Sequence, residues 1–213
     1  LMDDKEKEFF KSQILTYMGS KRKYISKIDE IIGLVKTALN TDTLTIGEGF
    51  SGSGIVSRLF KNRASGSNLG TFYVNDISGY SNTLNKCFLT STKNLSTDDL
   101  ENLIRYIKEI KTFIKNEPNH QPFIAKHWAP KDDENIQPEE RVYFTCENAK
   151  TIDKMLYFIK NFVQEKYKPY LLGPLLVECS IHNNTNGQFS AFYKDENREK
   201  GMYGGKKEID LKR

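Results

Sequence analysis

The sequence predicts an α/β protein whose parallel sheet is followed by a mainly helical region. Three observations predict this class. Residues 43–74 read as strand, turn, helix and strand, which is the order of a βαβ unit. The turn, I-G-E-G-F-S-G-S-G (46–54), contains four glycines and a phenylalanine. After residue 90, apolar residues recur at the three-to-four-residue spacing of helices.

The composition is that of an ordinary globular chain. Its 213 residues, 38% hydrophobic and 28% charged, suffice for one or two domains with a core. The net charge of +4 is weak evidence for a polyanionic partner. The three cysteines and three histidines lack disulfide or metal-ligand spacing, so we expect no metal and a cytoplasmic location. No apolar run approaches the ~18 residues of a membrane helix, and the acidic N-terminus does not resemble a signal peptide.

The first elements follow from apolar spacing and local turn residues. Residues 43–46 are predicted to form a short buried strand, and residues 55–60 a helix. Before them, residues 24–39 are predicted to form a helix capped by Ser20 and ended near Asn40. Its apolar face would carry Tyr24, Ile25, Ile28, Ile31, Ile32, Val35 and Leu39.

A loop and a second strand complete the βαβ unit. S-G-S-N-L-G (65–70) predicts a loop, and residues 71–74 predict a strand that ends at Asn75 and Asp76. The two strands should be parallel and joined by a right-handed crossover. A typical sheet has about five or six strands. Because residues 77–213 contain too few strand patterns to supply them, we expect only part of a doubly wound sheet.

Helical patterns dominate the rest of the chain. Ser96 and Asp99 resemble a capping box before a helix with Leu100, Leu103, Ile104, Ile107, Ile110 and Ile114 on one face. Residues 116–140 contain four prolines and predict a long loop. Thr145 is predicted to cap another helix, which Lys168-Pro169 should end. A further helix over residues 171–179 is ambiguous, because Gly173-Pro174 lies inside it.

The glycine turn predicts a ligand site. Glycines at a strand-to-helix turn let the backbone approach a ligand, and free N–H groups at the helix start favour negative or polar atoms. Asp76 follows the second strand, where an acid contacts ribose hydroxyls in this architecture. Glu48 would repel a pyrophosphate and attract an ammonium or sulfonium, which favours S-adenosylmethionine over NAD. The alternative is a glycine turn that packs a crossover without any ligand.

A second motif lies upstream. Y-M-G-S-K-R-K-Y (17–24) places an aromatic residue, a glycine and a lysine before a helix. By itself the motif reads as a capped helix with a basic first turn. Beside the glycine turn, Lys21 would bind a ligand carboxylate, and Gly19 and Ser20 would allow close backbone approach.

These stretches resemble the Dam-like class of adenine-specific DNA methyltransferases. Y-M-G-S-K-R-K-Y-I (17–25) is similar to its Y-x-G-S-K start, E-G-F-S-G-S-G-I-V (48–56) to its E-P-F-x-G-S-G turn, and V-N-D-I-S (74–78) to its N-D-I-N strand end. Two later stretches, Y-F-T-C-E-N-A-K-T-I-D (143–153) and N-T-N-G-Q-F-S-A-F-Y-K (184–194), are similar to segments of one branch of the class. The motifs follow the order of the class, so the resemblance covers nearly the whole chain.

The resemblance implies a Rossmann-like methyltransferase fold with a helical target-recognition region. It implies transfer of a methyl group from S-adenosylmethionine to the exocyclic amine of adenine in double-stranded DNA, in restriction-modification. The cofactor residues would be Tyr17, Gly19, Ser20 and Lys21 at the methionine end, Glu48, Phe50, Ser51, Gly52 and Gly54 in the turn, Asp76 on the ribose, and Ile77 on the adenine ring. Because phenylalanine is commonly buried, Phe50 could equally be an aromatic residue of the hydrophobic core. Gly49 stands where the class usually has proline, which leaves the turn freer.

The sequence departs from the class in one respect. Members hold the extruded adenine with a D-P-P-Y segment, whose acceptors polarise the amine and whose tyrosine stacks on the base. This chain contains no two adjacent prolines, and neither Phe144 nor Tyr193, which would suit base stacking, lies beside such a turn. We therefore expect no catalytic residue here and no methyl transfer by residues 1–213 alone. The D-P-P-Y half would follow Arg213, unless the protein is a naturally short relative.

The last 21 residues are candidates for contact with DNA. Residues 193–213 carry seven basic and five acidic side chains. Basic and aromatic residues suit a DNA backbone, and the candidates are Lys194, Arg198, Tyr203, Lys206 and Lys207. The alternative is a solvated loop, because interspersed acids weaken the field that phosphates would experience.

Together these expectations divide the chain into a cofactor-binding α/β part (1–90) and a mainly helical part (91–213). Two other function classes stay open. One is a non-catalytic adenosine-ligand or DNA-binding module. The other is a Rossmann-type NAD oxidoreductase, which Glu48 disfavours.

Overall fold

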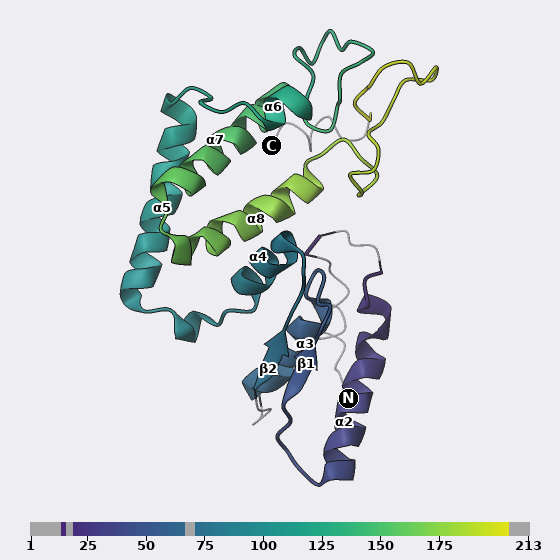
Figure 1. Cartoon of the computed structure of the whole chain (residues 1–213), viewed down its shortest axis with the longest axis vertical. Coiled ribbons are helices and arrows are strands. Elements are labelled where there is room, and N and C mark those ends of the chain that lie inside the picture. Colours follow the sequence, from purple (N-terminus) through teal and green to yellow (C-terminus); the bar gives the residue numbers. More distant parts are fainter. Residues whose placement is uncertain (1–13, 16–18, 67–70, 205–213) are drawn as a thin grey trace. The chain divides into compact units, whose positions relative to one another are not determined.

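The structure is a computed structural model that describes residues 14–15, 19–66 and 71–204. The chain forms two compact units, Leu1–Thr92 and Lys93–Arg213, and each is described by itself (Figure 1). The first contains a short parallel sheet with helices, and the second is helical. Within the described residues, no helix combines the length and apolar composition needed to cross a bilayer.

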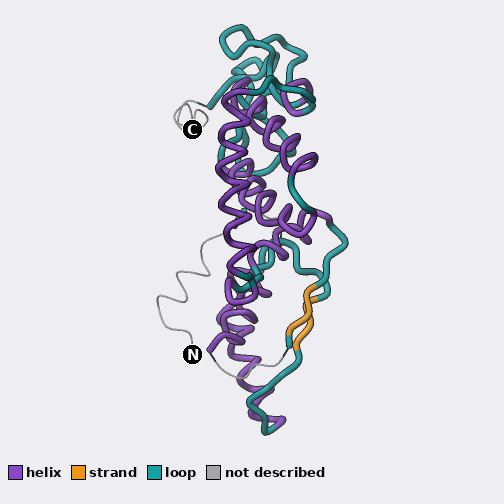
Figure 2. The backbone as a smooth tube through the Cα atoms, turned by 90° about the vertical axis from the view of Figure 1, so that its left-hand side faces the viewer, coloured by secondary structure: helices purple, strands orange, loops and turns teal. Residues whose placement is uncertain are grey.

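The sheet of the first unit consists of two parallel strands in the described part of the chain. β1 (Ile46–Glu48) pairs with β2 (Phe72–Val74), and Gly47 lies opposite Tyr73 (orange in Figure 2). The crossover between them contains α3 (Ile55–Gly66). The predicted order of strand, glycine turn, helix and parallel strand is confirmed.

The helices of the first unit form its small core. α2 (Ile25–Leu39) follows the short 3₁₀ turn η1 (Arg22–Tyr24) and packs against α3, and α3 also contacts both strands. The buried core residues are Ile25, Ile55, Val56, Leu59 and Phe60. Asn40 ends α2 as predicted, with a left-handed φ of 47°. Ile25, Ile28 and Ile32 form the side of α2 that faces this core, and Ile31, Leu34, Val35 and Leu39 form another apolar stripe that is exposed.

Three expectations for this unit were wrong. Ser20 does not cap α2, because η1 intervenes and no side chain caps the helix start. The first strand begins at Ile46 and not at Thr43, because Thr41 and Thr43 hydrogen-bond to each other in a local turn. Residues 65–66 belong to α3, whereas 67–70 lie outside the described residues.

One helix of the first unit was not predicted. α4 (Gly79–Phe88) follows β2 directly, and Ser78 lies at its N-terminal boundary. Its apolar residues Tyr80, Leu84, Cys87 and Phe88 recur at helical spacing, so the sequence carried a signal for this helix that the prediction missed.

The second unit is a helical bundle followed by a long loop. α7 contacts three other helices and therefore lies at the centre of the packing. The buried core includes Tyr106, Ile110, Phe158, Ile159 and Tyr167. The elements are η2 (Thr92–Asn94), which spans the boundary between the units, α5 (Thr97–Asn116), α6 (Ile124–His127), α7 (Cys146–Phe162), η3 (Glu165–Tyr167) and α8 (Lys168–Ile181).

Both helix caps predicted here are confirmed. The Ser96 hydroxyl accepts a hydrogen bond from the backbone N–H of Asp99, and the Asp99 carboxylate accepts one from the N–H of Ser96, each at 3.1 Å. The Thr145 hydroxyl accepts the N–H of Asn148 at 3.2 Å. Each cap satisfies an N–H group that has no partner inside the helix.

Two helix boundaries in this unit differ from the expectation. α7 ends at Phe162, where the buried Val163 adopts an extended conformation. Pro169 then lies in the first turn of α8, where a proline removes no helical hydrogen bond, so Lys168-Pro169 begins a helix and does not end one. The predicted 116–140 loop also contains the short helix α6.

The loop after α8 is organised by the fully buried Asn184. Its side-chain amide donates to the carbonyl oxygens of Val142 (2.8 Å) and Met202 (2.7 Å), and its side-chain oxygen accepts the N–H of Gly204 at 3.1 Å. Because both polar atoms of this side chain are used and its backbone N–H donates to Tyr143 O at 2.7 Å, Asn184 fixes the loop to residues 142–143. This residue begins the quoted N-T-N-G-Q-F-S-A-F-Y-K stretch.

Candidate functional site

The glycine turn between β1 and α3 is joined to the end of β2 by backbone hydrogen bonds. The N–H of Asn75 donates to Glu48 O at 2.9 Å, and the N–H of Ser51 donates to Asn75 O at 3.0 Å. Gly52 and Gly54 have φ values of 53° and 76°, which side chains other than glycine rarely adopt. The turn therefore depends on glycine at two of its positions. Gly49 has a φ outside this range and open space around a Cβ built there, so this position does not itself require glycine.

The Asp76 carboxylate connects the turn to α4. One carboxylate oxygen accepts the N–H of Gly52 at 2.8 Å, and the other accepts the N–H of Ser78 at 2.9 Å. These two backbone donors lower the pKa of Asp76 below its usual range, so the group is an anion at neutral pH. A carboxylate has about four acceptor positions, which leaves acceptor capacity for further donors.

Glu48 is the second carboxylate of the site and has a different environment. Its side chain accepts a hydrogen bond from the hydroxyl of Ser57 on α3. Burial raises the pKa of Glu48, and the nearby Asp76 charge raises it further. The hydrogen bonds from Ser57 and the Lys21 charge lower it. Two carboxyl groups, of which Asp76 is ionised at neutral pH, suit a ligand with both hydroxyl donors and a positive charge.

Two apolar side chains are exposed at the same ends of the strands. Phe50 is 91% exposed in the turn, and Ile77 is 99% exposed directly after Asp76. Phe50 is therefore not part of the hydrophobic core, which was the alternative expectation for this residue. Large apolar side chains with this exposure beside two carboxylates can contact the flat or aliphatic parts of a ligand.

The upstream motif contributes Lys21. Its charge lowers the pKa of Glu48, by the smallest of the effects that act on this carboxyl. The Lys21 ammonium also donates to the carbonyl oxygen of Gly19 at 2.7 Å, and Gly19 has a φ of 78°. Ser20 lies between these two residues and is half-buried. Tyr17 lies outside the described residues.

Two residues that the sequence did not single out support the site. The side-chain amide of Asn85, on α4, donates to the Ser51 hydroxyl at 2.7 Å. Ser57 is fully buried in the first turn of α3 and contacts Glu48. Asn85 and Ser51 are 34 positions apart, and no motif marks either supporting residue, so only the folded arrangement identifies them.

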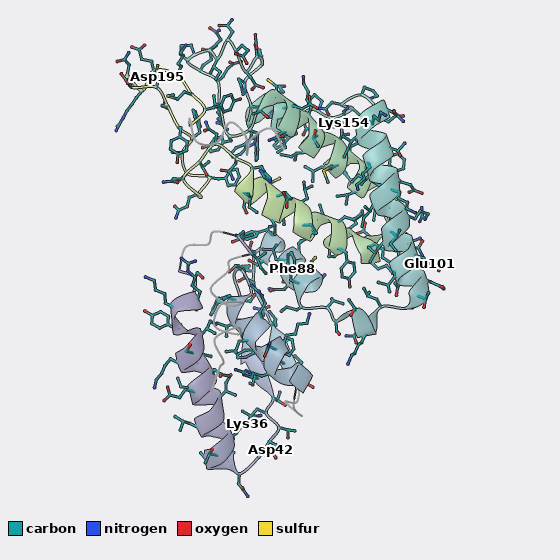
Figure 3. The ribbon with its side chains drawn as sticks, turned by 180° about the vertical axis from the view of Figure 1, so that it is seen from behind. Lys36, Asp42, Phe88, Glu101, Lys154 and Asp195 are labelled. Carbon is teal, nitrogen blue, oxygen red and sulfur yellow. The ribbon has the colours of Figure 1, made fainter. Side chains whose placement is uncertain are left out.

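The candidates for DNA contact lie in the loop after α8, where Figure 3 labels Asp195. Lys194 and Arg198 are exposed, and Lys194 forms an antiparallel bridge with Gly201 that closes a small hairpin. Tyr203 is half-buried, and its hydroxyl donates to Asp133. This contact gives Tyr203 a role within the fold. Lys206 and Lys207 lie outside the described residues.

The described geometry defines an α/β protein with a polar site at the glycine turn. A family model for the D12 class of N6 adenine-specific DNA methyltransferases matches residues 17–207. Because this match covers most of the chain, the chain belongs to that family, and the resemblance predicted from its motifs is confirmed.

Two curated relatives are similar at modest identity. The chain is 26% identical over 189 residues to "Modification methylase LlaI" of Lactococcus lactis subsp. lactis. It is 26% identical over 188 residues to "Type II methyltransferase M.FokI" of Planomicrobium okeanokoites. Each match covers 84% of this chain and 27% of the relative, so the chain spans about a quarter of the length of these relatives. No solved structure matches the chain.

Proposed function

We propose that this chain is the cofactor-binding and target-recognition part of an adenine-specific DNA methyltransferase that acts in restriction-modification. The reaction would transfer a methyl group from S-adenosylmethionine to the exocyclic amine of adenine in duplex DNA. The names of the two relatives support this class of reaction. The β1–α3–β2 unit would be part of a Rossmann-like sheet, with further strands in the complete enzyme.

The observation that carries the proposal is the grouping of two carboxylates and two exposed apolar side chains at the glycine turn. Asp76 would accept the ribose hydroxyls, and Glu48 would face the positive charge at the sulfonium or ammonium. Ile77 would pack on the adenine ring. Around the rest of the cofactor would lie Tyr17, Gly19, Ser20, Lys21, Phe50, Ser51, Gly52 and Gly54. When bound, S-adenosylmethionine supplies an electrophilic methyl group on a sulfonium.

The second unit would bind duplex DNA as the partner. Its exposed hairpin over residues 194–201 carries Lys194 and Arg198, and Lys206 and Lys207 follow in the sequence. Contacts from such cations would be to phosphates and would carry no sequence information. Tyr203 would support the hairpin through Asp133.

Titration calorimetry of the 213-residue chain with S-adenosylhomocysteine and with NAD tests the cofactor assignment. We expect 1:1 binding of S-adenosylhomocysteine, weakened about 10-fold or more by Asp76→Ala, because a charge-assisted contact is lost. Asp42→Ala is the matched control, since Asp42 is an exposed aspartate in the loop between α2 and β1 (Figure 3). NAD affinity equal to or above that of S-adenosylhomocysteine would contradict the assignment.

A further inference from the structure

Ser57 is a buried serine whose hydroxyl contacts a site carboxylate. It lies in the first turn of α3, is 0% exposed, and donates its hydroxyl hydrogen to the Glu48 carboxylate. Serine hydroxyls in helices often bond to a carbonyl of the preceding turn instead. Here the hydroxyl connects the first turn of α3 to the end of β1.

A hydroxyl at this position has a clear electrostatic effect on Glu48. Burial and the Asp76 charge both favour the protonated, neutral form of this carboxyl. The opposing groups are the Lys21 ammonium, which precedes α2, and Ser57 on α3, through both its hydroxyl and its backbone N–H. A hydrogen bond donated to a carboxylate stabilises the ionised form and also fixes the orientation of its oxygens.

We propose that Ser57 is a positioning residue of the cofactor site, whose hydroxyl keeps the Glu48 carboxylate ionised and oriented toward a bound cation. This inference rests on the proposed function, because the cation is the sulfonium or ammonium of S-adenosylmethionine. Ser57 itself does not touch the cofactor. It acts through Glu48, and alanine at the same position would leave the carboxylate buried with one donor fewer.

The proposal predicts a pH-dependent defect. In Ser57→Ala the pKa of Glu48 rises above that of the native chain, so a smaller fraction of the carboxyl is ionised in mildly acidic solution. We therefore expect the affinity of Ser57→Ala for S-adenosylmethionine to fall below that of the native chain, by about 10-fold at the lowest pH at which the chain stays folded, and to recover at pH 8. A role in packing alone would weaken binding equally at both pH values.

Two measurements test this, and they separate the inference from the proposed function. The first is calorimetry with S-adenosylmethionine between pH 5.5 and pH 8.5, for the native chain, Ser57→Ala and the hydroxyl-retaining Ser57→Thr. Ser26→Ala is the control, because Ser26 is an exposed serine on α2. Ser57→Thr should show the same dependence of affinity on pH as the native chain, and so should Ser26→Ala.

The second measurement follows the Glu48 carboxyl directly by ¹³C NMR titration of the ligand-free chain, with Glu48→Gln to assign its resonance. We expect Glu48 to titrate at higher pH in Ser57→Ala than in the native chain. An identical titration in both would overturn the proposal, as would an affinity loss independent of pH. Failure of the native chain to bind S-adenosylmethionine would instead contradict the proposed function, while the NMR titration would still decide the effect of Ser57 on Glu48.

Discussion

At the scale of single residues, the site depends on Gly54. Its φ of 76° lies in the left-handed region, and a Cβ atom added there would lie 2.5 Å from the side-chain oxygen of Asn85. Asn85 cannot move freely, because its amide donates to the Ser51 hydroxyl. A methyl group at this position would therefore disturb both the backbone and the contact between α4 and the turn.

Gly54→Ala is expected to lower the free energy of unfolding of the first unit by about 1–3 kcal/mol and to abolish cofactor binding. Gly33→Ala is the matched control. Gly33 lies inside α2, and apart from its chain neighbours and the nearby backbone of the helix no atom lies within 4 Å of an added Cβ, so alanine should stabilise the unit by about 0.5–1 kcal/mol. Urea unfolding and calorimetry measure the two effects. Equal stability of both variants would contradict the argument.

The sequence predicted those features of the candidate site whose geometry is local. Two glycines with positive φ and an acid after the second strand each have a recognisable position in a βαβ unit. Ser57 and Asn85 could not be predicted, because their hydrogen bonds join elements that only the tertiary fold brings together. Glu48 was predicted as a charge near a ligand, but its contact with α3 was not.

At the scale of secondary-structure elements, two of the three predicted helix caps are correct and the one at Ser20 is wrong, while the boundary predicted from proline alone is also wrong. Ser96, Asp99 and Thr145 cap their helices through their own side chains, so the signal lies within four residues. Pro169 is compatible with either the end of one helix or the start of the next. The extended Val163, which is buried in the core, decides between the two, and this depends on packing.

The hairpin over residues 194–201 is the element on which DNA contact can be tested. Asp195 stabilises its turn by accepting the N–H groups of Glu199 (2.8 Å) and Lys200 (3.3 Å). Lys194→Ala combined with Arg198→Ala should reduce the salt slope of duplex binding by about two at most, because each cation displaces about one counterion. Fluorescence anisotropy with mixed-sequence duplex between 50 and 200 mM salt would measure it.

The control for this experiment is the double variant Lys108→Ala and Lys111→Ala on α5. Both lysines are exposed in the same unit, so the total charge change is matched. The control should leave the salt slope unchanged. If both double variants reduce the salt slope equally, the effect comes from the change in total charge and not from contact between the hairpin and DNA. If duplex binding does not depend on salt at all, the hairpin is a solvated loop without phosphate contacts.

At the scale of the whole molecule, the two units differ in how complete their cores are. The second unit has a connected aromatic and aliphatic core around α7. In the first unit, the described sheet has two strands, Tyr73 is 64% exposed on it, and α2 exposes an apolar stripe. Parallel sheets are normally covered on both faces, so these exposed apolar side chains of the first unit are of the kind that an α/β layer ordinarily buries.

The last prediction concerns catalysis by the chain as a whole: the purified 213 residues should transfer no methyl group to adenine. The reaction requires an extruded base held in line with the methyl donor, with acceptors at its amine and an aromatic ring on its face. The sequence contains no D-P-P-Y segment. Two aromatic residues were considered for stacking on the base. Phe144 is only 3% exposed and belongs to the core of the second unit, so only Tyr193, which is 37% exposed, is accessible to a base.

The test incubates the chain with tritiated S-adenosylmethionine and mixed-sequence duplex DNA, followed by digestion and separation of the nucleosides. An enzyme with established adenine methylation of duplex DNA serves as the positive control under the same conditions. Tritium in methyladenine above a heat-killed sample would show that these 213 residues hold an acceptor site of their own. The first place to look for it would then be the exposed ring of Tyr193, since Phe144 could reach a base only if the core of the second unit opened.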